Sequence, residues 1–398
     1  MRVLHVIPSL DPSTGGPARS VPALCRALQA AGASVALYTF RNPYAPVTVS
    51  TDETFNLHQF KPLYGSREFP SPDFYSRIRR DVCSFDLAHL HSLWNPSISL
   101  AALACRRAGI PYLLSPRGML QGSAVGRRRR LKSVYHRLWE RSTIAGARAI
   151  HFCTDAEAQS SRRFLPRHKP FAVIRNGVEP VSNGLAGACE FREAFPSLQG
   201  KRIALFLGRL HWSKGLELQA EALALAVREF PELVWVLVGP DEGEWAHLSR
   251  QVARLGLEKH VLRTGPLPHA RCLEALKAAD LFLLTSRHEA HSMAMNEALA
   301  VGVPLVIADT VRFPEIRECG AGYVVPGGPQ PLAEAISSIL KHPEQARGMR
   351  EAGRRFASER LAWAHIARDM IEAYEEVLAP VDQRERQIIL RRIGVENI

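Results

Sequence analysis

Short runs of apolar residues alternate with longer stretches of helical period along most of the chain. Apolar runs of about four to eight residues between turn signals are typical of strands buried on both faces of a sheet. Their alternation with helices predicts parallel βαβ units rather than a sandwich or a helical bundle. A first set of strands is predicted at 3–7, 34–40, 87–90, 112–115, 149–153 and 171–174, and a second at 202–207, 233–239, 261–264, 281–285, 304–308 and 322–325.

Between the two sets, the stretch 177–200 is rich in Gly, Ser, Ala and Pro and lacks a clean period, which indicates a linker. The 398 residues also exceed what one hydrophobic core usually serves. The predicted fold class is α/β, with two Rossmann-like doubly wound parallel-sheet domains facing across a cleft. The predicted division is a first domain (1–180), a linker (181–200), a second domain (201–378) and a helical tail (379–398) that packs back on the first domain.

Charge is distributed unequally between the predicted domains. Residues 1–180 contain 25 Lys and Arg against 11 Asp and Glu, a net charge of +14, whereas the remainder carries −2. This asymmetry indicates that the first domain meets an anionic partner. The run Arg127–Arg130 opens a stretch with the pattern of a basic amphipathic helix, which fits an anionic membrane surface and equally a surface helix packed on its own domain.

Composition and terminal sequence narrow the class of protein. Hydrophobic residues make up 46% of the chain and charged residues 23%, as in ordinary globular proteins. The seven cysteines include no CxxC pair, so we expect reduced thiols rather than a disulfide framework or a zinc ribbon. No apolar run is long enough for a membrane span, and the start lacks the features of a secretory signal. We therefore expect a cytoplasmic protein.

The common phosphate loops and hydrolase motifs are absent: the chain contains no GxGxxG after its first strand, no GxxxxGK[ST], no HExxH and no GxSxG. Anion-binding features of another kind are present. Gly15 and Gly16 precede a predicted helix, where backbone N–H groups can point at an anion. Arg209 and Lys214 follow the first strand of the second set and can bind phosphate oxygens.

The most informative segment runs from Ser286 to Ala300, after an apolar strand and before a Gly-Val-Pro turn. A helix is predicted to start near Ser292, with Glu289 in the preceding loop and Glu297 inside the helix. At about 1.5 Å of rise per residue, the two carboxylates are about 12 Å apart, much of the length of a nucleoside diphosphate sugar. Backbone N–H groups of His291, Ser292 and Met293 would then meet the diphosphate at the helix N-terminus.

These motifs together resemble glycosyltransferase family 4, retaining enzymes of the GT-B fold. The resemblance covers most of the chain and depends on its combination of motifs in both domains. They are Gly15-Gly16-Pro17, His89 to Trp94, Ser115 to Leu120, Asn176-Gly177, Leu207-Gly208-Arg209, Lys214-Gly215, Val238-Gly239-Pro240, Thr264-Gly265, Ala279-Asp280-Leu281, Glu289 to Glu297 and Pro314-Glu315-Ile316. The resemblance implies sugar transfer from a nucleotide diphosphate to an acceptor with retention of anomeric configuration.

The resemblance also implies roles for individual residues. Glu297 would bind the ribose, Glu289 the hydroxyls of the donor hexose, and Arg209 with Lys214 the diphosphate, where they would stabilise the leaving group. The implied donor site, in which Gly16 belongs to a loop that closes over the phosphates, consists of Gly15, Gly16, Arg209, Lys214, Gly239, Gly265, Glu289, His291, Ser292, Met293 and Glu297. The resemblance further implies that no metal or other cofactor is needed, which fits the two cations already supplied by Arg209 and Lys214.

Two departures from the family pattern concern the acceptor and the donor sugar. Arg117 occupies a position where many members carry a histidine, and arginine cannot serve as a base, although it can bind an acidic acceptor or a phosphate. His91 is the candidate catalytic residue on the acceptor side. The usual Glu-Gly-Phe-Gly is Glu-Ala-His-Ser here, which leaves the donor sugar open.

The leading hypothesis is a glycosyltransferase of polysaccharide or lipopolysaccharide synthesis. It would use a UDP-sugar or GDP-sugar and a lipid-linked saccharide acceptor at the inner face of the cytoplasmic membrane. The alternatives are a sugar-nucleotide epimerase or a soluble sugar-phosphate synthase of the same fold. A nucleic-acid-binding protein using Arg127–Arg130 is a remote alternative, because no nucleic-acid motif accompanies that run.

Overall fold

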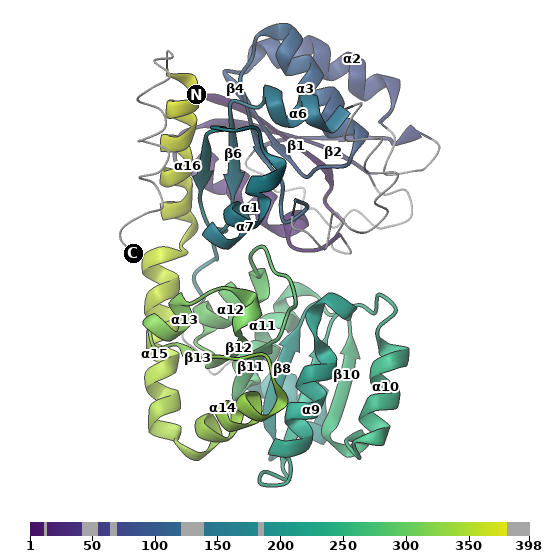
Figure 1. Ribbon diagram of the computed structural model, residues 1–398, viewed down its shortest axis with the longest axis vertical. Coiled ribbons are helices and arrows are strands. Elements are labelled where there is room, and N and C mark those ends of the chain that lie inside the picture. Colours follow the sequence, from purple (N-terminus) through teal and green to yellow (C-terminus); the bar gives the residue numbers. More distant parts are fainter. Residues whose placement is uncertain (12–13, 42–54, 64–69, 121–138, 182–186, 380–398) are drawn as a thin grey trace. The chain divides into compact units, whose positions relative to one another are not determined.

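The chain forms two compact α/β units, each built on its own parallel sheet (Figure 1). The first unit comprises Met1–Gly177 and Trp363–Ile398, and the second comprises Val178–Ala362. The computed structural model describes residues 1–11, 14–41, 55–63, 70–120, 139–181 and 187–379. The predicted class of two doubly wound parallel-sheet units is confirmed.

The first unit contains a seven-stranded sheet in the order β3-β2-β1-β4-β5-β6-β7, with all neighbours parallel. The strand order reverses between β1 and β4, so loops that follow these strands diverge and leave room for a ligand at the carboxyl edge. Its strands are β1 (Arg2–Ser9), β2 (Ser34–Phe40), β3 (Asn56–Phe60), β4 (Leu87–His91), β5 (Tyr112–Ser115), β6 (Ala149–Phe152) and β7 (Phe171–Val173). Its helices are α1 (Pro17–Ala30), α2 (Pro72–Asp81), α3 (Pro96–Ala108), α6 (Arg141–Gly146), α7 (Asp155–Ser161) and α16 (Trp363–Leu378).

The two faces of this sheet differ in chemistry because successive side chains of a strand point to opposite sides. Val6 and Leu90 belong to an apolar core with residues of α2, α3 and α6. The intervening positions His5 and His89 lie on the other face, where His89 contacts Tyr374 of α16. Helix α16 also packs on α1, so a segment from the end of the described chain completes the first unit (Figure 1).

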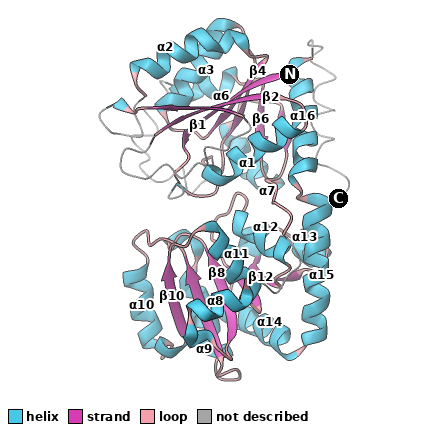
Figure 2. Ribbon diagram, turned by 180° about the vertical axis from the view of Figure 1, so that it is seen from behind, coloured by secondary structure: helices cyan, strands magenta, loops and turns pink. Residues whose placement is uncertain are grey.

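The second unit contains a six-stranded parallel sheet in the order β10-β9-β8-β11-β12-β13 (Figure 2). Alternate residues of its central strands enter two separate cores: Leu205 packs with residues of α11 and α12, and Phe206 with residues of α9 and α14. Its strands are β8 (Arg202–Leu207), β9 (Leu233–Val238), β10 (Val261–Gly265), β11 (Leu281–Leu284), β12 (Leu305–Ala308) and β13 (Gly322–Val325). Its helices are α8 (Ala188–Ala194), α9 (Leu216–Ala226), α10 (Trp245–Arg254), α11 (His269–Ala278), α12 (Met293–Val301), α13 (Glu315–Glu318), α14 (Pro329–Lys341) and α15 (Pro343–Arg360).

Every predicted strand is present, with ends within two residues of the predicted ones. Strand β3 was not predicted. Its sequence, Asn-Leu-His-Gln-Phe, is mostly polar and partly exposed, because it pairs only with β2 at the edge of the sheet. An edge strand buries too little side-chain surface to leave an apolar run in the sequence.

The boundaries of the two units differ from the predicted domains. The expected linker contains α8, whose Phe191 is buried in the core of the second unit. The expected second domain extended to residue 378, but α16 belongs to the first unit, because its apolar face packs against α1 and the sheet there. The chain leaves the second unit at Leu361, whose carbonyl accepts a hydrogen bond from the Val178 N–H at 2.7 Å. The predicted helical tail (379–398) lies outside the described residues except for Ala379.

Candidate active site

In the second unit, three glycines form tight turns at the carboxyl ends of neighbouring strands. The Gly208 N–H donates to the Val238 carbonyl, and the Gly239 N–H donates to the Gly265 carbonyl, both at 2.9 Å. A Cβ on Gly239 would lie 1.9 Å from the Gly208 oxygen, and φ of Gly239 is +143°. Only glycine therefore fits this position, and the loops of three strands can approach one another closely.

Lys214 and Glu289, predicted from separate motifs, are in direct contact. The Lys214 Nζ lies 2.6 Å from Glu289 Oε2, and the same oxygen accepts a hydrogen bond from Ser286 at 3.0 Å. The side chains are 16% and 13% exposed, so water screens the pair only partly. The loops after β8 and β11 supply the two residues, and these adjacent strands lie where the strand order reverses. This is the position at which doubly wound sheets bind ligands.

Arg209 does not join this pair. Its Nη1 lies 2.7 and 2.6 Å from the two carboxylate oxygens of Glu242, on the loop after β9. The side chains are 36% and 31% exposed, so the ion pair is accessible to solvent. A diphosphate that binds Arg209 would have to compete with Glu242 for the guanidinium.

Helix α12 begins where the sequence predicted. Ser292 is its N-cap, and its hydroxyl accepts a hydrogen bond from the Met295 N–H. Met293, the first helical residue, is partly exposed, whereas His291 is mostly buried and stacks on Phe313 at 5.8 Å between ring centroids.

Glu297 lies one turn further along α12 and is 4% exposed. Its Oε1 is 3.9 Å from Nδ1 of His269 at the start of α11. A carboxylate held in so little water forms strong hydrogen bonds with a hydroxyl group that reaches it.

In the first unit, the glycine pair after β1 starts helix α1. Gly15 adopts φ +97°, and Gly16 is the N-cap, without a side chain that could cap the helix. The first-turn N–H groups of Arg19 and Ser20 donate to the Gly16 carbonyl. The sequence prediction of a glycine turn immediately before a helix is therefore correct.

His91 and Arg117 lie at the same carboxyl edge, at the ends of β4 and β5. Arg117 Nη2 donates to His91 Nδ1 at 3.2 Å, and Nη1 donates to Asn176 Oδ1 at 2.7 Å. His91 is fully buried, and both burial and the Arg117 charge hold its pKa well below the usual range. His91, predicted as a catalytic residue, is thus buried and in direct contact with Arg117.

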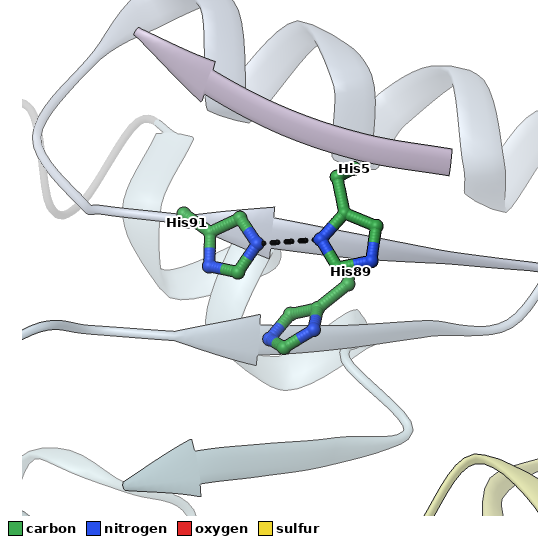
Figure 3. A group of neighbouring side chains, drawn as sticks. All are labelled: His5, His89 and His91. Atoms are coloured by element: carbon green, nitrogen blue, oxygen red, sulfur yellow. Dashed lines mark hydrogen bonds between the residues drawn. The ribbon is translucent and has the colours of Figure 1, made fainter. Parts of the chain in front are cut away.

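Sequence reasoning assigned no role to three further histidines on the same face as His91, namely His5, His89 and His151. The available signal was the spacing of His89 and His91, which places both on one face of a strand. One ring nitrogen from each of His5, His89 and His91 lies within 4.8 Å of the others, so this group could in principle hold a metal ion (Figure 3). The Arg127–Arg130 run lies outside the described residues.

Comparison with known families assigns both units. Residues 15–177 match the family described as "Glycosyl transferase 4-like domain", and residues 189–356 match the family described as "Glycosyl transferases group 1". The chain belongs to glycosyltransferase family 4 and has the GT-B fold. It is a glycosyltransferase.

Individual relatives are distant. The chain is 27% identical to spore coat protein SA of Bacillus subtilis, but this match spans 45% of the chain and only half of that protein. It is 25% identical to a GDP-mannose:cellobiosyl-diphosphopolyprenol alpha-mannosyltransferase of Xanthomonas campestris, over 95% of this chain and 97% of that one.

Among solved structures, Anabaena Alr3699/HepE in complex with UDP and glucose superposes with a TM-score of 0.75 at 20% identity. The superposition covers 94% of this chain and 99% of that one. Within the described residues, no helix is both long and apolar enough to cross a membrane.

Proposed function

We propose that this glycosyltransferase moves a hexose from a UDP-sugar or GDP-sugar to a lipid-linked saccharide acceptor, with retention of anomeric configuration, in cell-surface polysaccharide synthesis. The observation that carries the proposal is the contact between Lys214 and Glu289 beside the start of α12. A cation, a carboxylate and a helix N-terminus meet there at the reversal of strand order. Such a set matches the diphosphate and the sugar hydroxyls of a nucleotide sugar.

The two ends of the donor are assigned to the two carboxylates. Glu297 accepts hydrogen bonds from the ribose hydroxyls, and Glu289 accepts them from the hexose. Lys214, Arg209 and the N–H groups at the start of α12 bind the diphosphate. In the reaction, the bond between the anomeric carbon and a phosphate oxygen breaks, and the acceptor hydroxyl oxygen forms the new bond while its proton passes to the leaving diphosphate. Lys214 stabilises the negative charge that develops on that diphosphate.

Donor binding changes the ion pairs of the free site. The Lys214 ammonium has three N–H donors, so it can bind a phosphate oxygen while it keeps a hydrogen bond to Glu289. Arg209 must leave Glu242 at least in part. Two cations at the diphosphate stabilise the negative charge that a metal ion stabilises in other enzymes, so we propose that catalysis is independent of metals.

The names of relatives support the choice of donor and acceptor without deciding it. The full-length relative is named for GDP-mannose and a diphosphopolyprenol-linked acceptor, and the superposed structure is a complex with UDP. The proposal therefore includes both UDP-sugars and GDP-sugars as donors. The acceptor is proposed to be lipid-linked because the first 180 residues carry a net charge of +14, which favours an anionic membrane surface.

The test begins with thermal-shift titration of the full chain against UDP-, GDP- and ADP-sugars. The stabilising donor is then incubated with and without saccharide acceptors in EDTA, and the product linkage is read by NMR. We expect transfer with retention and full activity in EDTA. Lys214→Ala should lose transfer. Lys341→Ala, which removes an exposed lysine of α14 that pairs with Glu229, should retain it. Conversion of the donor sugar without acceptor would instead identify an epimerase.

A further inference from the structure

A row of buried polar side chains lies beneath α16 in the first unit. His5, His89, His91, His151, Ser115 and Tyr374 are each at most 2% exposed. The histidines and the serine come from β1, β4, β5 and β6 and share one face of the sheet, because their positions alternate with the core residues of the other face. Within the described residues, none of these four imidazoles bonds to a carboxylate, so their burial needs an explanation.

These side chains form one continuous chain of hydrogen bonds between Arg117 and the Ile174 carbonyl. Figure 3 shows one of these contacts, between His5 and His91. From Arg117 Nη2, the first bond reaches His91 Nδ1 at 3.2 Å, and the next joins His91 Nε2 to His5 Nδ1 at 3.0 Å. The Tyr374 hydroxyl then links the two halves, since its Oη lies 3.4 Å from His5 Nε2 and 2.7 Å from His89 Nδ1. The last three bonds are 2.6 Å from His89 Nε2 to Ser115 Oγ, 2.7 Å from Ser115 Oγ to His151 Nδ1, and 2.8 Å from His151 Nε2 to the Ile174 oxygen.

The two ends of this hydrogen-bond chain determine which ring nitrogens donate and which accept. An arginine can only donate and a carbonyl can only accept, while a neutral imidazole donates from one nitrogen and accepts at the other. Starting from Arg117, His91 and then His5 must accept at Nδ1 and donate from Nε2. Starting from Ile174, His151 must do the same, and so must His89. Both ends therefore give the same direction, independently of the long link between His5 and Tyr374.

The rings are neutral, as this direction requires. Burial lowers the pKa of His5 and of His151 to about 3, with the Arg117 charge acting in the same direction. Burial also lowers the pKa of His89 and His91 well below 6.5.

A metal ion would be a poor occupant of this site. His5, His89 and His91 offer three ring nitrogens within 4.8 Å, a number that zinc sites use. However, His5 Nδ1 and His91 Nε2 already bond to each other, and both nitrogens of His89 are hydrogen-bonded. The fixed positive charge of Arg117 would also repel a second cation.

At one end of the hydrogen-bond chain, Arg117 is a cation whose hydrogen-bond partners are all uncharged. Its guanidinium bonds to His91, Asn176 and Cys153, and within the described residues it makes no ion pair. The nearby Glu157 uses its two carboxylate oxygens for the N–H groups of Gly118 and Cys153. Arg117 Nε is buried without a hydrogen-bond partner. A partly buried guanidinium with neutral partners is stabilised by an anion that reaches it.

We propose that this one-directional chain holds the Arg117 guanidinium as a binding group for a substrate phosphate. The phosphate belongs either to the acceptor or to the donor diphosphate, and only this assignment rests on the proposed function. The histidines and Tyr374 are positioning residues, because they act on the substrate through Arg117. Their neutral state leaves the guanidinium charge available to the phosphate.

The first experiment measures the histidine tautomers directly in the full-length protein labelled with 15N-histidine. Long-range 1H–15N spectra at pH 7 should show the four histidines of this hydrogen-bond chain protonated at Nε2 only, with Nδ1 as acceptor. Addition of Zn2+ should leave these signals unchanged. A proton on Nδ1 of any of the four, or a zinc-induced shift at His5, His89 and His91, would overturn the chain.

The second experiment titrates inorganic phosphate while the His91 Nδ1 signal is followed. We expect a saturable shift that weakens about 10-fold or more in Arg117→Gln, as for a lost hydrogen bond to a charged group. Arg107→Gln, which replaces an exposed arginine bonded to the Tyr75 hydroxyl, should respond as the wild type does. Equal phosphate affinity in wild type and Arg117→Gln would overturn the anion site.

Two further arms identify the source of the phosphate and the role of Tyr374. If the phosphate response persists in saturating UDP or GDP, the site serves the acceptor; if the nucleotide itself produces the shift, it serves the donor diphosphate. Tyr374→Phe should leave the tautomers of His5 and His89 unchanged, because each is fixed from its own end, but should shift the His5 Nε2 and His89 Nδ1 signals and weaken phosphate binding. Unchanged signals and unchanged phosphate affinity in a folded Tyr374→Phe would remove Tyr374 from the chain. These spectra require no sugar transfer, so they can fail while the transferase assay succeeds, and the reverse.

Discussion

At the scale of single residues, the two glutamates of the candidate site in the second unit, Glu289 and Glu297, lie in different surroundings. Glu289 is paired with Lys214 and bonded to Ser286, whereas Glu297 is 4% exposed and faces His269 at 3.9 Å. The pairing of Glu289 couples its position to the cation that binds the leaving group. Glu297 has no such link to Lys214, so we expect the two glutamates to affect different steps.

Glu297→Ala should weaken binding of the donor's nucleotide about 10-fold, because a ribose hydroxyl loses a charged acceptor. Glu289→Ala should lower kcat more than it lowers nucleotide affinity, because it acts at the sugar and through Lys214. Calorimetric titration with UDP and GDP, together with kcat and KM for the donor, separates the two effects. The control is Glu334→Gln, at an exposed position of α14, and wild-type kcat and KM in both site variants would refute the assignment.

The buried histidines predict how stability depends on pH. The pKa of His5 and of His151 is about 3 in the folded chain, compared with 6.5 for an exposed histidine. Between these values the unfolded chain binds more protons, so stability falls as the pH drops below 6.5, by up to about 1.4 kcal/mol per pH unit for each histidine.

Thermal unfolding midpoints between pH 7 and pH 4 test this dependence. A His151→Gln variant should show a shallower fall, because one of the extra protons is absent, while His247→Gln at an exposed site should follow the wild type. Equal slopes in all three proteins would show that His151 is not held in the neutral form in the folded chain.

At the scale of elements, the site depends on how closely strand-end loops approach each other. The Gly239 and Gly208 loops meet at a distance that excludes any Cβ, and Lys214 stands at the end of a short 3-10 turn, Trp212–Lys214, that follows β8. Gly215 caps this turn with φ +63°, and its carbonyl accepts a hydrogen bond from Thr285 at 2.8 Å. The loops after β8 and β11 are thereby tied to each other beside Glu289.

Gly239→Ala should lower the thermal midpoint and weaken donor binding, because its Cβ would lie 1.9 Å from a backbone oxygen. Gly243→Ala is the matched control: Gly243 also has a positive φ, +92°, but nothing lies within 4 Å of an added Cβ. Gly243→Ala should show only the conformational cost of about 1 kcal/mol. If the two variants behave alike in differential scanning fluorimetry and nucleotide titration, close approach of the loops is not what the site requires.

At the scale of the whole molecule, the charge asymmetry of the chain predicts salt-dependent membrane binding. With +14 in residues 1–180, each Lys or Arg near an anionic leaflet contributes about 1 kcal/mol. In liposome flotation, the protein should bind vesicles rich in acidic lipids at low salt and be released at high salt. Replacement of Arg127–Arg130 by glutamines should weaken binding, whereas replacement of Arg79 and Arg80 on α2 should have less effect. Equal flotation with neutral vesicles would contradict the electrostatic mechanism.

The sequence by itself determined the order of strands and helices and the positions of the ligand loops. Apolar runs such as 202–207 and 281–285 are local signals, and right-handed crossovers leave few ways to connect them. The N-cap at Ser292 and the glycine turn before α1 were predictable because a few adjacent residues specify them. Placing Lys214 and Glu289 at one sheet edge follows from the same rules.

Only the tertiary structure decided which distant residues are in contact. Tyr374 bonds to His89 across 285 positions, and no local pattern specifies that pairing or assigns α16 to the first unit. The direct contact of Lys214 with Glu289, and of Arg209 with Glu242 instead, also depends on side-chain packing after the loops have formed. The physical reason is that periodicity reports which face of an element is buried, whereas the partner on that face is set by packing between elements.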